Sequence, residues 1–176
     1  MNHSITLRDA QLTDATTIAQ LHAQSWRQTY RGIYSDAFLD HNVLEDRYTV
    51  WQERLTTPRQ QQQVILAEQA TTLVGFACLF IDDDLQFGTL LDNLHIAAQW
   101  QGAGIGKQLL QACATRISDL SKNHKLYLWV YETNERARKV YERLGAVHHE
   151  TVDQPTASGT PARACRYVWE DVSVLL

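Results

Sequence analysis

Residues 94–107 read Leu-His-Ile-Ala-Ala-Gln-Trp-Gln-Gly-Ala-Gly-Ile-Gly-Lys, and this stretch joins a predicted strand to a predicted helix through a glycine-rich turn. The first backbone N–H groups of a helix have no partner inside the helix and lie at the positive end of its dipole. Glycines at such a turn let an anion approach the backbone without meeting a Cβ atom. The stretch therefore predicts an anion-binding turn over residues 101–107.

The spacing of the glycines excludes two common phosphate-binding motifs. A dinucleotide-binding fingerprint reads G-x-G-x-x-G, and Lys107 stands where its third glycine would lie. A P-loop reads G-x-x-x-x-G-K-[ST], but Gln101 stands at its first glycine and Gln108 follows the lysine. The pattern that remains is Q-x-x-G-x-G over residues 101–106, which by itself also fits a turn that binds nothing.

A second segment, residues 129–147, carries another strand-to-helix junction. Asn134 is a favourable N-cap for a helix over residues 134–144. Apolar side chains recur every three or four residues of that helix, which predicts one buried face. Taken alone, Tyr141 is then a core aromatic residue with a hydrated hydroxyl. The predicted buried face of this helix consists of Ala137, Val140, Tyr141 and Leu144.

Taken together, the two segments resemble the GNAT acetyltransferase superfamily. In that family a [Q/R]-x-x-G-x-[G/A] turn holds the pyrophosphate of coenzyme A, and the next helix follows N-x-x-A-x-x-x-Y-x-x-x-G-[F/A]. The resemblance covers roughly residues 73–150. The second pattern is met here by Asn134, Ala137, Tyr141, Gly145 and Ala146.

The resemblance implies transfer of an acetyl group from acetyl-CoA to an amine, which attacks the thioester directly in a ternary complex. The acceptor is expected to be a primary amine of a small molecule or a peptide N-terminus. The pantetheine arm is expected along the backbone of Leu94, His95 and Ile96, in a mode similar to strand addition. Cofactor contacts are expected from Asn134 and Tyr141 and from the turn residues Gln101, Gly102, Ala103, Gly104, Ile105, Gly106 and Lys107.

Catalytic roles follow from the same resemblance. A backbone N–H near Ile96 is expected to stabilise the oxyanion, and Tyr141 is the candidate general acid for the leaving thiolate. Asp92 and His95, expected on opposite faces of their strand, are candidate bases, with Glu132 as a third. Each of these three also fits a structural or solvated role, and an amine that binds already neutral needs no base.

The acceptor pocket has weaker signals. Trp26 and Tyr30 lie four residues apart on a predicted helix, so both can wall a small pocket, although core packing explains them equally well. A non-catalytic CoA-binding regulatory module of the same fold is the alternative function, and the presence of Tyr141 argues against it.

Composition sets further expectations. The 176 residues carry 16 Lys and Arg against 20 Asp and Glu, and a net charge of −4 is unfavourable for nucleic-acid binding. The longest apolar run falls short of the roughly 20 residues of a membrane helix. The three cysteines are well separated, so neither a disulfide framework nor a metal site is expected. We expect a cytoplasmic protein without membrane partners. The sequence does not decide between a monomer and a homodimer.

Periodicity predicts an α+β protein with one domain over residues 1–176. The predicted elements fit the GNAT fold, which is a mixed, mostly antiparallel twisted sheet of about six to seven strands, flanked by helices on both faces. A turn is expected at residues 82–84 and a loop at residues 154–161. Strands are predicted at residues 4–8, 63–68, 73–81, 89–97, 126–131, 146–152 and 164–170, and helices from residue 13 or 14 and at residues 43–55, 104–120 and 134–144.

Overall fold

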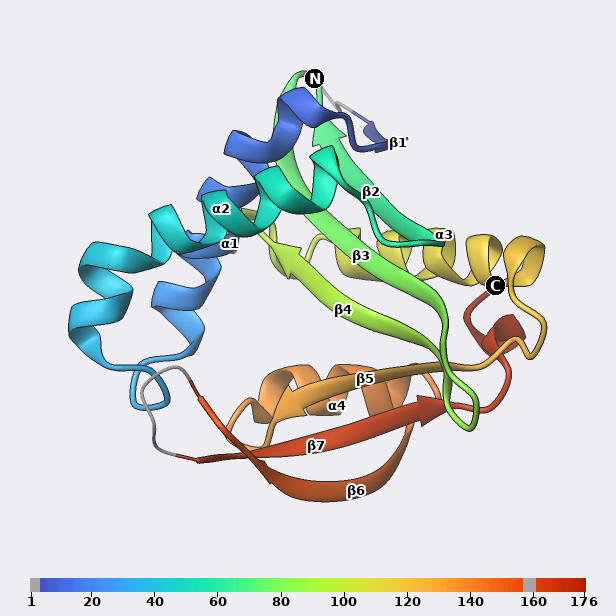
Figure 1. The fold of residues 1–176 in the computed structure, drawn as a ribbon. Coiled ribbons are helices and arrows are strands. Elements are labelled where there is room, and N and C mark those ends of the chain that lie inside the picture. The colour runs from blue at the N-terminus through green and yellow to red at the C-terminus, as the bar shows by residue number, and fades with distance from the viewer. Residues whose placement is uncertain (1–3, 157–160) are drawn as a thin grey trace.

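Seven strands form one twisted sheet in the computed structural model, which describes residues 4–156 and 161–176 (Figure 1). The strand order is β1-β2-β3-β4-β5-β7-β6. Neighbouring strands are antiparallel except for β4 and β5, which run parallel. The strands are β1 (Ile5–Asp9), β2 (Gln62–Gln69), β3 (Thr72–Asp84), β4 (Gly88–Ile96), β5 (Leu126–Tyr131), β6 (Val147–Gln154) and β7 (Ala162–Trp169).

Helices cover both faces of this sheet, as the sequence predicts. The first two α-helices pack on one face of β2 and β3, the third packs on the opposite face of these strands, and the fourth lies behind β5 and β7 (Figure 1). The α-helices are α1 (Ala15–Thr29), α2 (Val43–Thr56), α3 (Ile105–Leu120) and α4 (Glu135–Arg143). Shorter 3₁₀ helices are η1 (Leu12–Asp14), η3 (Ala98–Trp100) and η4 (Val172–Leu175), and η2 (Phe38–Asn42) is a π-helix.

The central strand β3 shows why two layers of helix are needed. Successive side chains of a strand point to opposite faces, and β3 is apolar on both. Its even-numbered side chains from residue 76 to residue 80 pack against α1 and α2, while the odd-numbered ones from 77 to 81 pack against α3. All three cysteines are buried free thiols. The predicted α+β fold with a mixed, mostly antiparallel sheet is therefore confirmed.

Two local features differ from the sequence prediction or extend beyond it. A turn was expected at residues 82–84, but strand β3 continues through Asp84. The turn comes after the strand because the Asp84 carboxylate accepts hydrogen bonds from the N–H groups of Gln86 and Phe87. Helix η4 was not predicted, yet it buries Val172 and Leu175 in the core beside α3. Of the expected loop, residues 157–160 lie outside the described residues.

Strands β4 and β5 pair over a very short length. Only Thr89 with Leu126 and Leu90 with Tyr127 form the parallel ladder. Beyond these pairs the two strands part, so that one edge of β4 has no neighbouring strand among the residues that the structure describes (Figure 1). In the described part of the chain, no helix combines the length and apolar character that crossing a membrane requires.

Core packing between α3 and the sheet predicts a large loss of stability on truncation of Leu109, which is fully buried. Leu109→Ala should lower the free energy of unfolding by about 2–5 kcal/mol, because it removes buried methyl groups and leaves a cavity. Leu120→Ala, on the exposed end of the same helix, should change it by less than about 0.5 kcal/mol. Urea denaturation of both variants measures the difference, and equal effects would contradict this account of the core.

Candidate active site

A cleft of about 940 Å³ opens where β4 and β5 part. Its walls come from the end of α1, from β4 and β5, from the turn before α3 and from α4. A volume of this size is typical of a small-molecule site. Most residues that the sequence singled out meet here: Tyr30, Asp92, Leu94, His95, Ile96, Gln101, Gly102, Gly104, Ile105, Gly106, Lys107, Asn134 and Tyr141 line the cleft, while Ala103 and Trp26 are not among its lining residues.

The glycine turn has the backbone geometry that only glycine adopts readily. Gly102 has φ +86° and Gly104, the N-cap of α3, has φ +80°. A Cβ atom at either position would meet nothing within 4 Å, so the turn is open on its outer side. The first N–H used inside α3 is that of Gln108, which donates to the Gly104 carbonyl (3.1 Å). The N–H groups of Gln101 and Ala103 donate to the carbonyls of Ala98 and Trp100, whereas those of Ile105, Gly106 and Lys107 precede the first helical hydrogen bond and can bind an anion.

The turn is tied to its surroundings by the side chain of Gln101. Its Nε2 donates to the carbonyl of Ile96 at the end of β4 (3.3 Å), and its Oε1 accepts from Arg136 of α4 (2.9 Å). This glutamine therefore connects the end of β4 with α4 across the mouth of the cleft. Lys107 is exposed in the first turn of α3 and adds positive charge at the same end.

The free edge of β4 presents backbone groups to the cleft. The N–H of Ala97 donates to the carbonyl of Val74 (2.9 Å), so Ala97 faces β3. Because backbone groups alternate in direction along an antiparallel ladder, those of His95 also face β3, while those of Leu94 and Ile96 point into the cleft. An extended molecule with amide groups can hydrogen-bond to this edge as an added strand would.

The expectation that Asp92 and His95 lie on opposite faces of β4 is wrong, because β4 contains a bulge at Asp92. Asn93 pairs with Cys78 of β3, and Leu91 pairs with the next residue of β3, so Asp92 has no partner across the strands. The extra residue shifts the alternation of side chains beyond it by one position. A simple alternating pattern in the sequence gives no sign of such a bulge.

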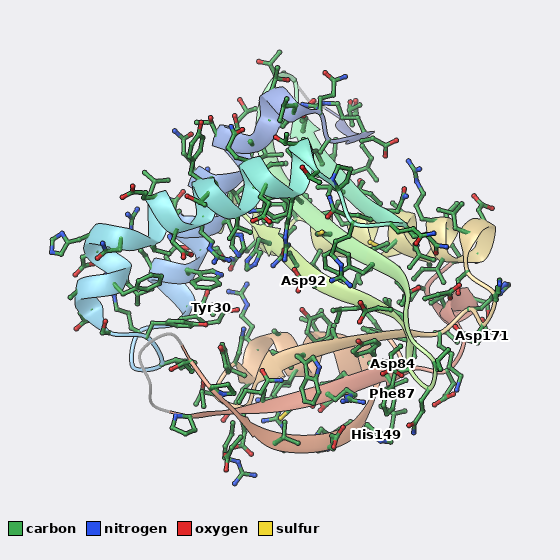
Figure 2. All side chains as sticks on the ribbon, viewed as in Figure 1. Tyr30, Asp84, Phe87, Asp92, His149 and Asp171 are labelled. Carbon is green, nitrogen blue, oxygen red and sulfur yellow. The ribbon has the colours of Figure 1, made fainter. Side chains whose placement is uncertain are left out.

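The bulge turns Asp92 toward the side of the sheet that carries α1 and α2. Its carboxylate forms an ion pair with Arg54 of α2 (2.7 Å), and the ring of His95 packs against that of His22 of α1 (4.5 Å between centroids). Figure 2 places Asp92 at the edge of β4 and Tyr30 at the end of α1, on two sides of the same space. The third candidate base, Glu132, pairs with Arg163 (3.0 Å) and does not line the cleft.

Two neutral histidines pack together at the cleft, where His95 is a lining residue and His22 lies behind it. The His95 Nδ1 forms a hydrogen bond with the Ser25 hydroxyl (2.8 Å), and the indole N–H of Trp51 donates to His22 Nδ1 (3.0 Å). Burial, together with the charge of Arg47, lowers the pKa of His95 to about 4. Burial likewise lowers the pKa of His22 well below its usual range. Both rings are therefore uncharged at neutral pH.

Helix α4 contributes Tyr141 and Asn134. The Tyr141 ring packs edge-on against Trp169 (6.0 Å between centroids) and lines the cleft. Burial raises its pKa to about 12, so the phenol remains protonated and able to donate at neutral pH. The Asn134 Oδ1 accepts from the N–H of Ala137 (3.3 Å), which confirms the predicted N-cap.

An aromatic group lies where the end of α1 meets β5 at the cleft. Tyr30 lines the cleft and meets Tyr131 of β5 edge-on (5.2 Å). Trp26 packs behind Tyr30 (5.4 Å) and beneath the guanidinium of Arg47 (4.2 Å). The hydroxyls of Tyr34 and Tyr131 form a hydrogen bond (3.0 Å). Sequence reasoning missed Tyr34 and Tyr131, because no motif links the loop after α1 to the end of β5.

This combination of a sheet parted at β4 and β5 and a glycine turn that begins α3 defines the GNAT type of fold. Residues 21–146 match the acetyltransferase (GNAT) family, so the chain belongs to that family. The resemblance seen in the two sequence segments is thereby confirmed. Among the described residues, no three His, Cys, Asp or Glu side chains are grouped so that they could hold a metal ion.

Individual relatives are distant. The chain is 36% identical over 78 residues to the spermine/spermidine N(1)-acetyltransferase of Bacillus subtilis, a match that covers 42% of this chain and 51% of that protein. The chain thus spans about half the length of that relative. The PaiA N-acetyltransferase of Thermoplasma acidophilum, solved in complex with coenzyme A, has a TM-score of 0.72 at 20% identity, with 94% of this chain and 99% of that chain covered.

A third similar structure is YncA of Salmonella typhimurium, solved with its cofactor acetyl-CoA. It has a TM-score of 0.68 at 16% identity, and the match covers 94% of this chain and 93% of that chain. At such low identity these two structures establish that this chain shares their fold.

The positive φ of Gly104 yields a test of the turn. Gly104→Ala should weaken coenzyme A binding at least about tenfold, because the methyl group strains the backbone and lies on the side from which a phosphate approaches. Gly32→Ala is the matched control, since Gly32 has φ +84° and similar open space but lies in the loop after α1. Isothermal titration with coenzyme A measures both, and equal affinity of the two variants would contradict the assignment.

The depressed pKa of His95 predicts acid sensitivity. Its pKa of about 4 in the folded state lies below the unfolded value of 6.5, so protonation favours unfolding. Its contribution is complete above pH 6.5 and is lost as the pH falls toward 4, with about 2 kcal/mol lost at pH 5. Urea denaturation at pH 7.5 and 5 should show a drop that His95→Asn reduces by this amount. Replacement of the exposed His41 by Gln should leave the drop unchanged.

Proposed function

We propose that the protein is an N-acetyltransferase that transfers acetyl from acetyl-CoA to a primary amine of a small molecule or peptide N-terminus by direct attack in a ternary complex. The observation that carries this proposal is the unpaired edge of β4, which leads directly into the open glycine turn of α3. Family membership and the position of Tyr141 in the same cleft support it.

The cofactor fits this cleft by its chemistry. The pyrophosphate would accept hydrogen bonds from the free N–H groups of the turn, and the side chains of Lys107, Arg136 and Arg143 supply positive charge around it. The pantetheine amides would pair with the backbone of Leu94 and Ile96. The thioester then lies toward the bulge at Asp92, about 7 Å farther along β4 than Leu94.

In the proposed reaction, strand β4 stabilises the oxyanion and helix α4 supplies the proton donor. The amine nitrogen attacks the thioester carbonyl, whose oxygen is stabilised by a backbone N–H of β4. Collapse of the tetrahedral intermediate breaks the carbon–sulfur bond, and Tyr141 donates its proton to the leaving thiolate. The proton lost by the amine restores the phenol by way of solvent. The high pKa of Tyr141 supports this role, since the phenol is protonated when the thiolate leaves.

Asp92 is a better candidate than His95 for the residue that binds the amino group of the acceptor. His95, with a pKa of about 4, is a weak base at neutral pH, and its Nδ1 is engaged by Ser25. Asp92 is the single carboxylate among the described residues that line the cleft. An ammonium group is attracted to this carboxylate and gives its proton to solvent, and the neutral amine then attacks.

A polyamine acceptor is a second candidate, favoured by similarity to the spermine/spermidine N(1)-acetyltransferase of Bacillus subtilis. The remaining cleft lining near α1 is uncharged, with Ser25, Gln28, Thr29 and Tyr30. Because Asp92 is the single carboxylate among the described lining residues, the cleft favours an acceptor with one ammonium group over a polyamine with several.

Thiol release from acetyl-CoA in the presence of separate amines tests the proposed function. Spermidine, tyramine and a short peptide with a free N-terminus represent the acceptor classes, and mass spectrometry identifies the acetylated product. Transfer to at least one amine is expected. Binding of acetyl-CoA without transfer to any amine would instead favour a regulatory CoA-binding module.

The role of Tyr141 has its own test. Tyr141→Phe should lower turnover by about 10²-fold, because it removes the proton donor but keeps the packed ring. Acetyl-CoA affinity should change little. Tyr48→Phe, at an exposed position of α2, should behave as the wild type. Initial rates at saturating acetyl-CoA measure the effect, and undiminished turnover in Tyr141→Phe would restrict Tyr141 to a packing role.

A further inference from the structure

Arg54, in the last turn of α2, reaches across to the bulge of β4. A single nitrogen, Nη1, lies 2.7 Å from Oδ2 of Asp92 and 2.8 Å from Oδ1 of Asn93. Its guanidinium also lies over the rings of Trp51 (5.3 Å) and Phe80 (5.4 Å). The arginine is thus held by aromatic contacts at the same time as it binds both residues of the bulge.

The bulge needs such a support more than a regular strand would. Asp92 has no partner across the strands, and the β4 edge beyond it has no neighbouring strand on the cleft side. Without other contacts, the side chain of an unpaired residue samples several rotamers, and fixing them costs entropy. The ion pair with Arg54 fixes the Asp92 carboxylate, and the bond to Asn93 fixes the neighbouring residue of the strand.

The pair is also partly shielded from water. The side chains of Arg54 and Asp92 are 24% and 28% exposed, which is less than for most ion pairs on this surface. Shielding strengthens the attraction and makes the loss of one partner more costly. Arg54 itself is not among the residues that line the cleft, whereas Asp92 is. Any effect of Arg54 on the reaction must therefore pass through the bulge.

We propose that Arg54 is a positioning residue of the active site, which holds the β4 bulge so that the Asp92 carboxylate meets the acceptor's amino group. This inference rests on the proposed acetyl transfer. Arg54 acts on the acceptor step and not on cofactor binding, because the glycine turn and the free edge at Leu94 and Ile96 lie outside its contacts. Its removal should therefore affect turnover without affecting acetyl-CoA affinity.

Arg54→Met tests the proposal, because methionine keeps much of the apolar stem and removes the charge. Arg54→Lys is the conservative variant, with a charge but without the planar guanidinium. Arg59→Met is the matched control. Arg59 lies over the same Phe80 ring (4.1 Å) and pairs with Asp83 (3.0 Å), but it touches neither residue of the bulge. The rates use the amine from the panel above that gives the fastest transfer.

We expect Arg54→Met to lower kcat by about 10–100-fold, since displacement of a reacting group by about 1 Å costs that much. Acetyl-CoA affinity should stay within twofold of the wild type. Arg54→Lys should recover part of the rate, added guanidinium ion should partly rescue Arg54→Met, and Arg59→Met should match the wild type. Rescue by a small cation separates positioning of Asp92 from a general loss of folding.

A double variant completes the test. If Arg54 acts through Asp92, Arg54→Met should cause no further loss in an Asp92→Asn background. Full additivity, or wild-type turnover in folded Arg54→Met, would overturn the proposal while acetyl transfer by the wild type stands. A wild-type protein that binds acetyl-CoA and acetylates no amine would overturn the proposed function, and this inference with it.

Discussion

The parting of β4 and β5 after two residue pairs is the constraint on which the rest of the structure depends. A strand edge in a protein interior leaves N–H and C=O groups without partners, and such groups are costly unless water or a ligand satisfies them. Here the edge lines an open cleft, so water satisfies it until a ligand with amide groups takes its place. After β4 the chain passes through η3 and the glycine turn into α3, whose first N–H groups add further hydrogen-bond donors.

A sheet that parts in the middle must be held together at its ends. On the side of the glycine turn, Gln101 joins the end of β4 to Arg136 of α4. On the other side, the hydroxyl bond between Tyr34 and Tyr131 joins the loop after α1 to the end of β5. Each of these bridges joins parts of the chain that are distant in the sequence.

The local geometry of the glycine turn and of the Asn134 N-cap could be predicted from the sequence, whereas the geometry around Asp92 and Trp26 could not. The turn is a local feature, because positive φ at Gly102 and Gly104 and the N-cap at Asn134 depend on residues close in the chain. The bulge at Asp92 is set by pairing with β3 and is invisible in an alternating pattern. Spacing likewise cannot tell that Tyr30 lines the cleft while Trp26 lies behind it.

The charges of the cleft are separated in a way that suits the proposed reaction. Among the described lining residues, the cations Lys107, Arg136 and Arg143 come from α3 and α4, and the single carboxylate comes from the bulge of β4. A cofactor with several phosphates and an acceptor with an ammonium group are thus drawn to different regions of one cavity. Arg54 approaches that carboxylate from behind, on the α2 side, and does not line the cleft itself. The ion pair therefore orients Asp92 while leaving its cleft side open to an incoming amine.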